Sequence, residues 1–563
     1  MPGDGKKLRV VFCWHMHQPE YRQFGSRTFQ LPWTYLHAIK DYWDMAVHLE
    51  SFPAARVVVN FAPVLLEQID DYAGQVHAFL TEGTPFRDEL LGALVDPAMP
   101  SDPLKQLGLI NACLRLNHER LVKPYPAYAR LAAIADLVRD HQELLNYLSH
   151  QYLVDLVVWY HLAWLGDTCR RSDERVRHLE EKGHNFTLAD RLGLLEVIGE
   201  MIGGILPRYR SLAERGQIEL SVTPYAHPIL PLLLDIDSAR EAMPDAPMPL
   251  IDQYPGGEAR ARWHIEHGLE VFRQHFGFAP AGCWPAEGAV SEATLRLLEQ
   301  SGFRWAASGE NVVKNSLSRQ GQPYVNCPQR PYRLKEGSLT CFFRDDGLSD
   351  RIGFTYSDWH ADDAVADFIR HRENIEADCD GGDRVGSIIM DGENAWEYYP
   401  QNGYHFLRGL YAQLSNHPRL EMVTFSDCLA QIPEVASLPQ LVAGSWVYGT
   451  FSTWIGDAEK NRGWDMLGDV KRCFDRTVGR LDETHRRSAE QLLAICEGSD
   501  WFWWFGDYNP EDVVSDFERL FRMNLANLYL LLGESPPAYL TEAFTHGAGS
   551  PIKGGAMRPG SIN

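Results

Sequence analysis

The sequence IIMDGENAWEYYP at residues 388–400 contains the strongest indication of the fold. An apolar run of strand type ends abruptly at Asp391 and is followed by a carboxylate, an amide and aromatic side chains. In parallel α/β barrels, catalytic groups lie at this place, the C-terminal mouth of a strand. A second junction of the same kind, GCWPAEG at residues 282–288, contains Glu287. The two junctions predict a barrel whose mouth carries two carboxylates.

Asp391 and Glu287 together indicate carbohydrate chemistry. A pair of carboxyl groups can cleave a glycosidic bond, and the neighbouring Trp and Tyr side chains offer flat faces to sugar rings. Either acid alone could be an ordinary loop residue or a helix N-cap. Their occurrence at two strand ends, beside the motifs described below, favours a catalytic pair.

Short β-rich runs recur along the chain, and helical patterns such as residues 259–276 and 291–301 separate most of them. Alternation of strands and helices predicts βα units and a parallel sheet. Seven or eight units with polar strand ends favour a barrel over an open doubly wound sheet. The expected strands are residues 8–14, 57–61, 218–222, 282–284, 303–307, 340–343, 385–390 and 422–425.

The barrel is expected to occupy residues 1–432, with a large helical insertion at about residues 72–215. Helical periodicity dominates residues 433–544, best in 476–496 and 510–532, and predicts a C-terminal α-helical region. The aromatic and acidic cluster at residues 497–504 indicates that this region contributes to the active site. Residues 545–563 are rich in Gly and Pro and are expected to form a flexible tail. The loop at 235–254 could overhang the site.

Composition excludes several classes of partner. The 563 residues include 53 Lys and Arg and 76 Asp and Glu, so the net charge is 53 − 76 = −23. Nucleic acid and anionic membrane surfaces are therefore not expected as partners, because phosphate binding needs clustered basic residues. No signal-peptide pattern and no run of ~18 apolar residues is visible. With ten scattered cysteines and no CxxC pair, a cytoplasmic protein is expected. No oligomeric state follows from the sequence.

The first strand ends in the sequence HMHQP, which contains His15, His17 and Gln18. Alternate strand residues point to the same side, so the two histidines could bind a metal together. They could instead form hydrogen bonds with sugar hydroxyls, or have a structural role only. The metal is the weaker functional interpretation because no companion motif completes a ligand set.

Two further motifs place polar and aromatic groups near the expected barrel mouth. The third strand is followed by TPYAHP, with Tyr225 and His227 before a proline-fixed turn. Near the C-terminus, EGSDWFWW at residues 497–504 contains Asp500, Trp501 and Trp503. Such aromatic density is typical either of a core or of a wall on which sugars stack.

Five motifs along the chain resemble the five ordered sequence regions of glycoside hydrolase family 57. Their sequences are most similar to those of its amylopullulanase-like branch. The resemblance extends from residue 9 to about residue 507. The motifs are HMHQP (15–19), GQIEL (216–220), WPAEG (284–288), MDGEN (390–394) and EGSDW (497–501).

The resemblance implies a (β/α)7 barrel followed by a helical region that completes the active site. It also implies retaining cleavage of α-glucosidic bonds without a metal or other cofactor. Glu287 matches the nucleophile and Asp391 the general acid/base. The substrate-binding candidates are His15, His17, Gln18, Tyr225, His227, Trp284, Glu393, Trp396, Asp500, Trp501 and Trp503, of which His15, His17, His227 and Trp501 match positions around the sugar in subsite −1.

The expected function is a retaining α-glucan hydrolase that cleaves α-1,4 and α-1,6 bonds, with an α-glucan polysaccharide or maltooligosaccharide as its partner. Within the same family, a 4-α-glucanotransferase or a branching enzyme is an alternative, since only the acceptor differs. A metal-dependent polysaccharide deacetylase that uses His15 and His17 is an alternative from another class. A catalytically silent glycan-binding protein is disfavoured by the presence of both carboxylates.

Overall fold

A computed structural model describes residues 7–321, 329–377, 384–432 and 434–549. Residues 550–563, most of the expected tail, lie outside the described residues. None of the described helices is long and apolar enough to cross a lipid bilayer.

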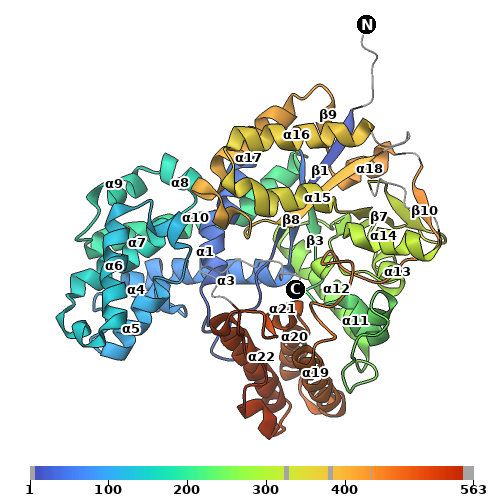
Figure 1. Ribbon diagram of the computed structural model, residues 1–563. Helices are drawn as coiled ribbons and strands as arrows, with labels where there is room; N and C mark the ends of the chain where they lie inside the picture. Colours follow the sequence, from blue (N-terminus) through green and yellow to red (C-terminus); the bar gives the residue numbers. More distant parts are fainter. Residues whose placement is uncertain (1–6, 322–328, 378–383, 433, 550–563) are drawn as a thin grey trace.

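The centre of the molecule is a curled sheet of parallel strands (Figure 1). Arg344, directly after β7, forms a parallel bridge to Ser387 in β8, so the two ends of the parallel part of the sheet meet. The fold is therefore a (β/α)7-type barrel with large helical regions, as predicted. In their order of pairing the parallel strands are β7 (Thr340–Phe343), β5 (Trp305–Ser308), β4 (Gly282–Cys283), β3 (Ile218–Val222), β2 (Val57–Phe61), β1 (Leu8–Met16) and β8 (Val385–Asp391).

Three short strands lie outside this ring. The expected eighth run at 422–425 forms β9 (Leu420–Met422), which pairs only with the first residues of β1, and then enters helix α18 (Phe425–Gln431). Strand β6 (Tyr332–Leu334) runs antiparallel to β7, and β10 (Ala436–Leu438) pairs with β6. The ring of the described sheet therefore has seven strands, although β9 is also parallel to β1 and β10 to β6.

The ring strands are apolar because both of their faces are covered. Every residue of β2 is buried, as is every residue of β1 after Leu8. Strands buried on both faces lack the alternation of half-exposed strands and appear as continuous apolar runs. The helices around the barrel, besides α18, include α1 (Trp33–His37), α2 (Trp43–Ser51), α11 (Leu230–Leu234), α12 (Gly257–Phe276), α13 (Glu292–Gln300), α14 (Glu310–Arg319), α15 (Asp346–Asp350), α16 (Ala361–Ala377) and α17 (Tyr404–Ser415).

The expected helical insertion lies between β2 and β3 and projects to the left in Figure 1. Helicity begins earlier than residue 72, because Pro63 occupies the first turn of α3, where its missing N–H costs no hydrogen bond. The insertion contains α3 (Pro63–Glu82), α4 (Glu89–Val95), α5 (Pro103–Ala112), α6 (Pro126–Asp140), α7 (His150–Trp164), α8 (Asp167–Ser172), α9 (Glu174–Lys182) and α10 (Leu188–Glu214).

The C-terminal helices are α19 (Ala458–Thr477), α20 (Glu483–Cys496), α21 (Ser499–Trp504) and α22 (Glu511–Leu531). The expected helix at 476–496 begins later, because the Asp482 side chain caps α20 by accepting a hydrogen bond from the backbone N–H of His485. The loop at 235–254 packs against α19 instead of overhanging the site. The backbone N–H groups of Leu250 and Ile251 in this loop donate to Asp465.

Candidate active site

A buried pocket lies where the C-terminal ends of the barrel strands meet. His15 in β1 pairs in register with Asp391 at the end of β8, and Glu287 follows β4. The expected carboxyl pair therefore lines one pocket. Its walls also include side chains from the insertion and from the C-terminal helices. The lining residues are His15, His17, Gln18, Pro19, Tyr21, Trp33, Arg115, His227, Trp284, Glu287, Asp391, Glu393, Asn394, Trp446, Trp503, Trp504, Val513 and Phe517.

Glu287 is held in a backbone conformation that most residues avoid. Its φ angle is +57°, in the left-handed region, and that of Gly288 is +59°. A Cβ atom at Gly288 would lie 2.6 Å from the Trp284 ring, so the WPAEG motif needs glycine there. Non-glycine residues in this region are strained and cluster at functional sites. The strained turn aims the Glu287 carboxyl into the pocket.

Trp446 holds Glu287 through two hydrogen bonds. Its indole Nε1–H donates to Oε2 of Glu287 at 2.9 Å, and its backbone N–H donates to the Glu287 carbonyl at 3.0 Å. Burial raises the pKa of Glu287 well above its ordinary value, nearby Asp391 raises it further, and the indole hydrogen bond lowers it. In the sequence, Trp446 was one of several tryptophans near the C-terminus, and nothing distinguished it as a partner of Glu287.

Asp391 is also buried, and burial raises its pKa. A hydrogen bond from Asn394 to Asp391 Oδ2 at 2.8 Å and the proximity of His17 oppose that rise. Two buried carboxyl groups that repel each other do not both ionise readily near neutrality. The pair is therefore suited to hold one proton and one negative charge, and apparent pKa values belong to the pair.

A chain of hydrogen bonds fixes the protonation of two histidines. Asn60 donates its amide to Ser221, so its Oδ1 accepts from Thr223 and from Nδ1 of His15 at 2.7 Å. Burial lowers the pKa of His15 to about 3, so this ring is neutral and its Nε2 is an acceptor. The Nε2–H of His227, 3.1 Å away, is then the donor to His15.

Nδ1 of His227 accepts from the Ser499 hydroxyl at 2.8 Å, so both nitrogens of His15 and of His227 are occupied. Burial lowers the pKa of His227 well below its ordinary value, and this ring is neutral too. Among these three rings, only Nδ1 of His17 lacks a hydrogen-bond partner in the described part of the chain. The expected wall of sugar-binding histidines is thus a stack, in which His17 offers the available nitrogen.

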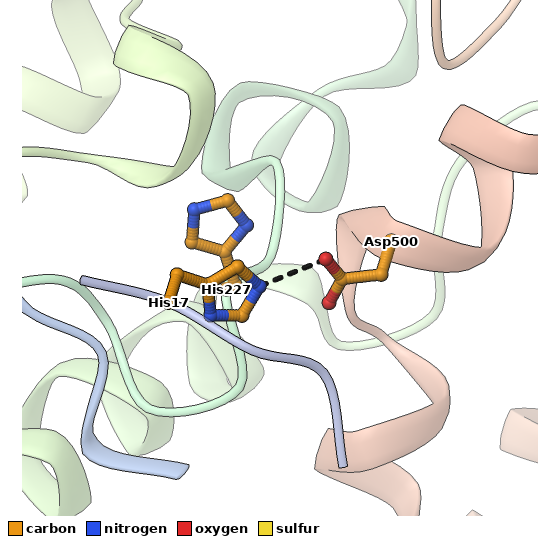
Figure 2. A group of neighbouring side chains, drawn as sticks. All are labelled: His17, His227 and Asp500. Carbon is orange, nitrogen blue, oxygen red and sulfur yellow. Dashed lines mark hydrogen bonds and ion pairs between the residues drawn. The ribbon is translucent and has the colours of Figure 1, made fainter. Parts of the chain in front are cut away.

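The residues able to hold a metal differ from the expected pair. Within the described residues, His17, His227 and Asp500 place ligand atoms within 4.8 Å of one another (Figure 2). Imidazole nitrogens with a carboxylate are a ligand set that zinc uses. His15 and His227 each engage both ring nitrogens within the protein, so a metal at His17, His227 and Asp500 would have to displace a hydrogen bond of His227.

The EGSDW motif attaches the C-terminal helices to the barrel. The Glu497 carboxylate is fully buried and accepts hydrogen bonds from Arg260, His264 and Tyr254, all on the barrel side. Burial alone raises the pKa of Glu497, but the charge of Arg260 and the bond from His264 outweigh it and lower the pKa to about 2. An ionised, fully paired carboxylate therefore anchors this motif.

The residues after Glu497 follow the end of β3 closely. Gly498 bridges to Pro228, and a Cβ atom there would lie 2.8 Å from the carbonyl oxygen of Ala226. The backbone N–H of Ser499 donates to the His227 carbonyl at 2.9 Å. Asp500 then accepts from Nε2 of His17 at 2.8 Å. One more turn of α21 brings Trp503 and Trp504 to the pocket wall.

Gln18, Glu393 and Trp284, three of the substrate-binding candidates, line the pocket. The Gln18 amide donates to Glu393 Oε1 at 3.3 Å, and the Tyr21 hydroxyl donates to Gln18 at 3.0 Å. Burial, reinforced by the charge of Asp391, raises the pKa of Glu393 well above its ordinary value. The raised pKa favours the neutral form of Glu393, so this third acid adds little negative charge beside Asp391.

Four expected binding residues do not line the pocket. The Tyr225 hydroxyl donates to Glu67, Trp396 is buried against Trp14, and the Trp501 indole donates to the Ile495 carbonyl. Asp500 accepts a hydrogen bond from His17 and does not itself line the pocket. Pocket residues that the sequence did not single out come from distant segments, for which no motif gave a signal. They include Trp33, Arg115, Val513 and Phe517, besides Trp446.

The buried Glu497 cluster generates a stability prediction. Glu497→Gln leaves the Arg260 charge buried without a counter-charge, and we expect it to lower the free energy of unfolding by about 3–5 kcal/mol at pH 7. The folded-state pKa of Glu497 lies below its ordinary value of 4.5, so the stabilisation is present above pH 4.5 and is lost as pH falls towards about 2. Urea unfolding of both proteins between pH 7 and pH 3 measures this.

Glu483→Gln is the matched control. Glu483 lies in α20, and its half-exposed carboxylate pairs with Arg486 and Arg487 at the surface. Such pairs contribute about 0–1 kcal/mol, so this variant should unfold close to wild type. Equal stabilities of the Glu497→Gln and wild-type proteins at pH 7 would contradict the anchoring role.

Comparisons with known proteins agree with this geometry. Residues 11–439 match the family model described as Glycosyl hydrolase family 57. No curated protein sequence matches significantly. Similar solved structures include a family 57 branching enzyme from Thermococcus kodakaraensis, with 16% identity, TM-score 0.58 and coverage of 93% of this chain and 90% of that one. The α-amylase AmyC from Thermotoga maritima has 14% identity, TM-score 0.58 and coverage of 94% and 93%. A 4-α-glucanotransferase from Thermococcus litoralis has 15% identity, TM-score 0.51 and coverage of 93% and 60%. At these identities the similarity establishes the fold.

Proposed function

The chain belongs to glycosyl hydrolase family 57, and on this premise we propose that it is a retaining α-glucan hydrolase of the amylopullulanase type, cleaving α-1,4 and α-1,6 glucosidic bonds. The observation that carries the proposal is the carboxyl pair, Glu287 and Asp391, buried together in a pocket with aromatic walls. Two carboxyl groups with shifted pKa values at one sugar-sized site are the requirement for glycosidic cleavage.

In this mechanism Glu287 attacks the anomeric carbon while Asp391 donates its proton to the leaving glycosidic oxygen. The product is a covalent glycosyl ester on Glu287. Asp391, now ionised, removes a proton from water, which attacks the same carbon and releases the sugar with retained configuration. The ester bond breaks in this step, and Glu287 returns to its free carboxylate form.

The surroundings of each carboxyl group suit its role. The indole N–H of Trp446 stabilises negative charge on Glu287 and so favours the nucleophilic form. Burial keeps Asp391 protonated more readily than an exposed aspartate. Forming the ester removes the negative charge of Glu287 and therefore favours ionisation of Asp391 as a base.

The remaining pocket residues position the sugar. His17, Trp503 and Trp504 line the pocket, and Nδ1 of His17 is buried without a partner in the described residues, so we assign it to a hydroxyl group of the bound sugar. Trp446, Trp503 and Trp504 all lie after residue 433, so we propose that the C-terminal region is part of the active site. We propose the same division as the sequence indicated: a barrel of residues 1–432 and a helical region of 433–544.

A 4-α-glucanotransferase or branching enzyme is the second candidate. The apolar wall formed by Trp503, Trp504, Val513 and Phe517 favours it, because a glucan acceptor packs on such a wall better than water does. The deacetylase alternative is not supported, since the family match assigns the chain to glycosyl hydrolases and His15 is not free to bind a metal.

Product analysis tests the proposed reaction. Maltoheptaose should give shorter maltooligosaccharides with a matching rise in reducing ends, and pullulan should give maltotriose through cleavage of its α-1,6 bonds. Glu287→Gln protein, prepared identically, controls for contaminating amylases. Products longer than maltoheptaose without new reducing ends would identify the enzyme as a transferase instead. Intact pullulan would restrict the hydrolase to α-1,4 bonds.

Variants of the carboxyl pair should respond differently to a good leaving group. With an α-glucosyl fluoride, Asp391→Asn should keep most of the first step, because fluoride departs without protonation, and should be slow in deglycosylation. Azide attacks without a base, so it should restore turnover of Asp391→Asn and give an α-glucosyl azide of retained configuration. Glu287→Gln should lose several orders of magnitude with every substrate and give no retained azide. An azide product of retained configuration from Glu287→Gln would mean that Asp391 is the nucleophile and Glu287 the acid/base.

Activity is expected not to need a metal, because the hydrogen bonds of His15, His17 and His227 explain these residues without one. Dialysis against EDTA should leave kcat on maltoheptaose within about twofold of the untreated enzyme, a margin well under 1 kcal/mol. Elemental analysis of the same samples provides the control for metal content. Reversible loss of activity that zinc restores would assign a metal to His17, His227 and Asp500.

A further inference from the structure

A second hollow adjoins the active-site pocket. Its walls are residues 28–33, the start of α4, the end of α5, α7 and α22. It has a cavity volume of about 440 Å³. Ligand pockets in proteins span roughly 300–1,000 Å³, so a ligand of several sugar units would fit.

The hollow shares part of its wall with the active-site pocket. Trp33 and Arg115 line both spaces. Helix α22 also borders both, because Val513 and Phe517 face the pocket and Asp516 faces the hollow. Residues three and four apart share one face of a helix, so a single face of α22 forms part of the wall of both the pocket and the hollow.

The junction between the two spaces is fixed by an ion pair. Nη1 of Arg115, from the helical insertion, lies 2.6 Å from Asp516 Oδ2 in α22. The Arg115 guanidinium also lies 5.6 Å from the centre of the Trp33 ring. These contacts join the insertion to α22 and place the Trp33 indole and the Arg115 guanidinium at the neck between the two spaces.

The lining chemistry indicates a neutral, hydroxyl-rich ligand. Asp88, Glu89 and Asp516 are its acids and Arg115 is its one basic residue, which Asp516 neutralises. An anionic ligand such as a phosphate is therefore disfavoured. Exposed amide and carboxylate side chains, including Glu89, can bond sugar hydroxyls, and the aromatic rings that line the hollow are buried in its wall.

We propose that this hollow is a distal binding site for the α-glucan chain, which holds the sugar units beyond those at the carboxyl pair. The inference rests on the proposed function, since the occupant is the same substrate. Binding in the hollow makes the enzyme selective for long glucans, and the glucan passes between the two spaces at the Trp33–Arg115 neck.

Filling the hollow tests the proposal. Ala112 is the half-exposed last residue of α5 and lines the hollow but not the active-site pocket. Ala112→Trp should lower the ratio of kcat/KM for maltoheptaose to kcat/KM for α-maltosyl fluoride by about tenfold or more, a loss equal to about 1.4 kcal/mol. An unchanged ratio in the folded variant would overturn the proposal.

Ala127→Trp is the matched control, because Ala127 is a half-exposed alanine in α6 of the same insertion and lies outside both spaces. Its ratio should stay within about twofold of wild type. Asn111→Trp, at an exposed neighbouring position in the hollow, replaces Ala112→Trp if circular dichroism shows that the latter is misfolded. The same fall in the ratio is expected.

Calorimetry separates failure of this proposal from failure of the proposed reaction. If the wild-type enzyme turns over neither substrate, the proposed function fails, and maltoheptaose binding to Glu287→Gln is compared with binding to the Glu287→Gln/Ala112→Trp protein. A Kd about tenfold higher in the double variant would support binding in the hollow independently of the reaction. Equal Kd values, or no binding to either protein, would overturn it.

Discussion

The buried carboxylate of Glu497 is the constraint on which the geometry of the pocket depends. Its pairing with Arg260 and His264 fixes a point of the C-terminal region against α12 of the barrel. The next residues follow the end of β3, where Ser499 meets His227 and Asp500 meets His17. A buried ion pair is costly to break and specific in position, so it sets the register between the barrel and the helices that close the pocket.

Burial acts in opposite directions on the two kinds of titratable group in the pocket. It raises the pKa of Glu287 and Asp391, and it lowers the pKa of His15 and His227. Both effects have one cause, since a low-dielectric site disfavours charge of either sign. The pocket thus contains two neutral imidazoles with fixed tautomers, those of His15 and His227, beside a carboxyl pair whose pKa values are raised. This electrostatic pattern suits proton transfer to and from a neutral sugar.

Much of the fold could be predicted from sequence because continuous apolar runs, such as residues 8–14 and 57–61, specify buried parallel strands by themselves. Glu287 and Asp391 were predicted for the same reason, as acids directly after such runs. The eighth expected strand was less well defined, because β9 pairs with only the first residues of β1 and the chain then turns into α18. The start of α20 depended on one capping side chain, Asp482.

The sequence by itself determined the barrel, its helical insertion and the two carboxyl groups, because periodicity and strand-end chemistry are local properties. Only the tertiary structure decided which aromatic residues face the pocket. Trp503 reaches it, whereas Trp501, two positions earlier on α21, bonds to Ile495 behind it. It also brought Trp446 to Glu287 across 159 residues. Such contacts depend on how distant segments pack, and burial and hydrogen bonding between them leave no periodic signal in the chain.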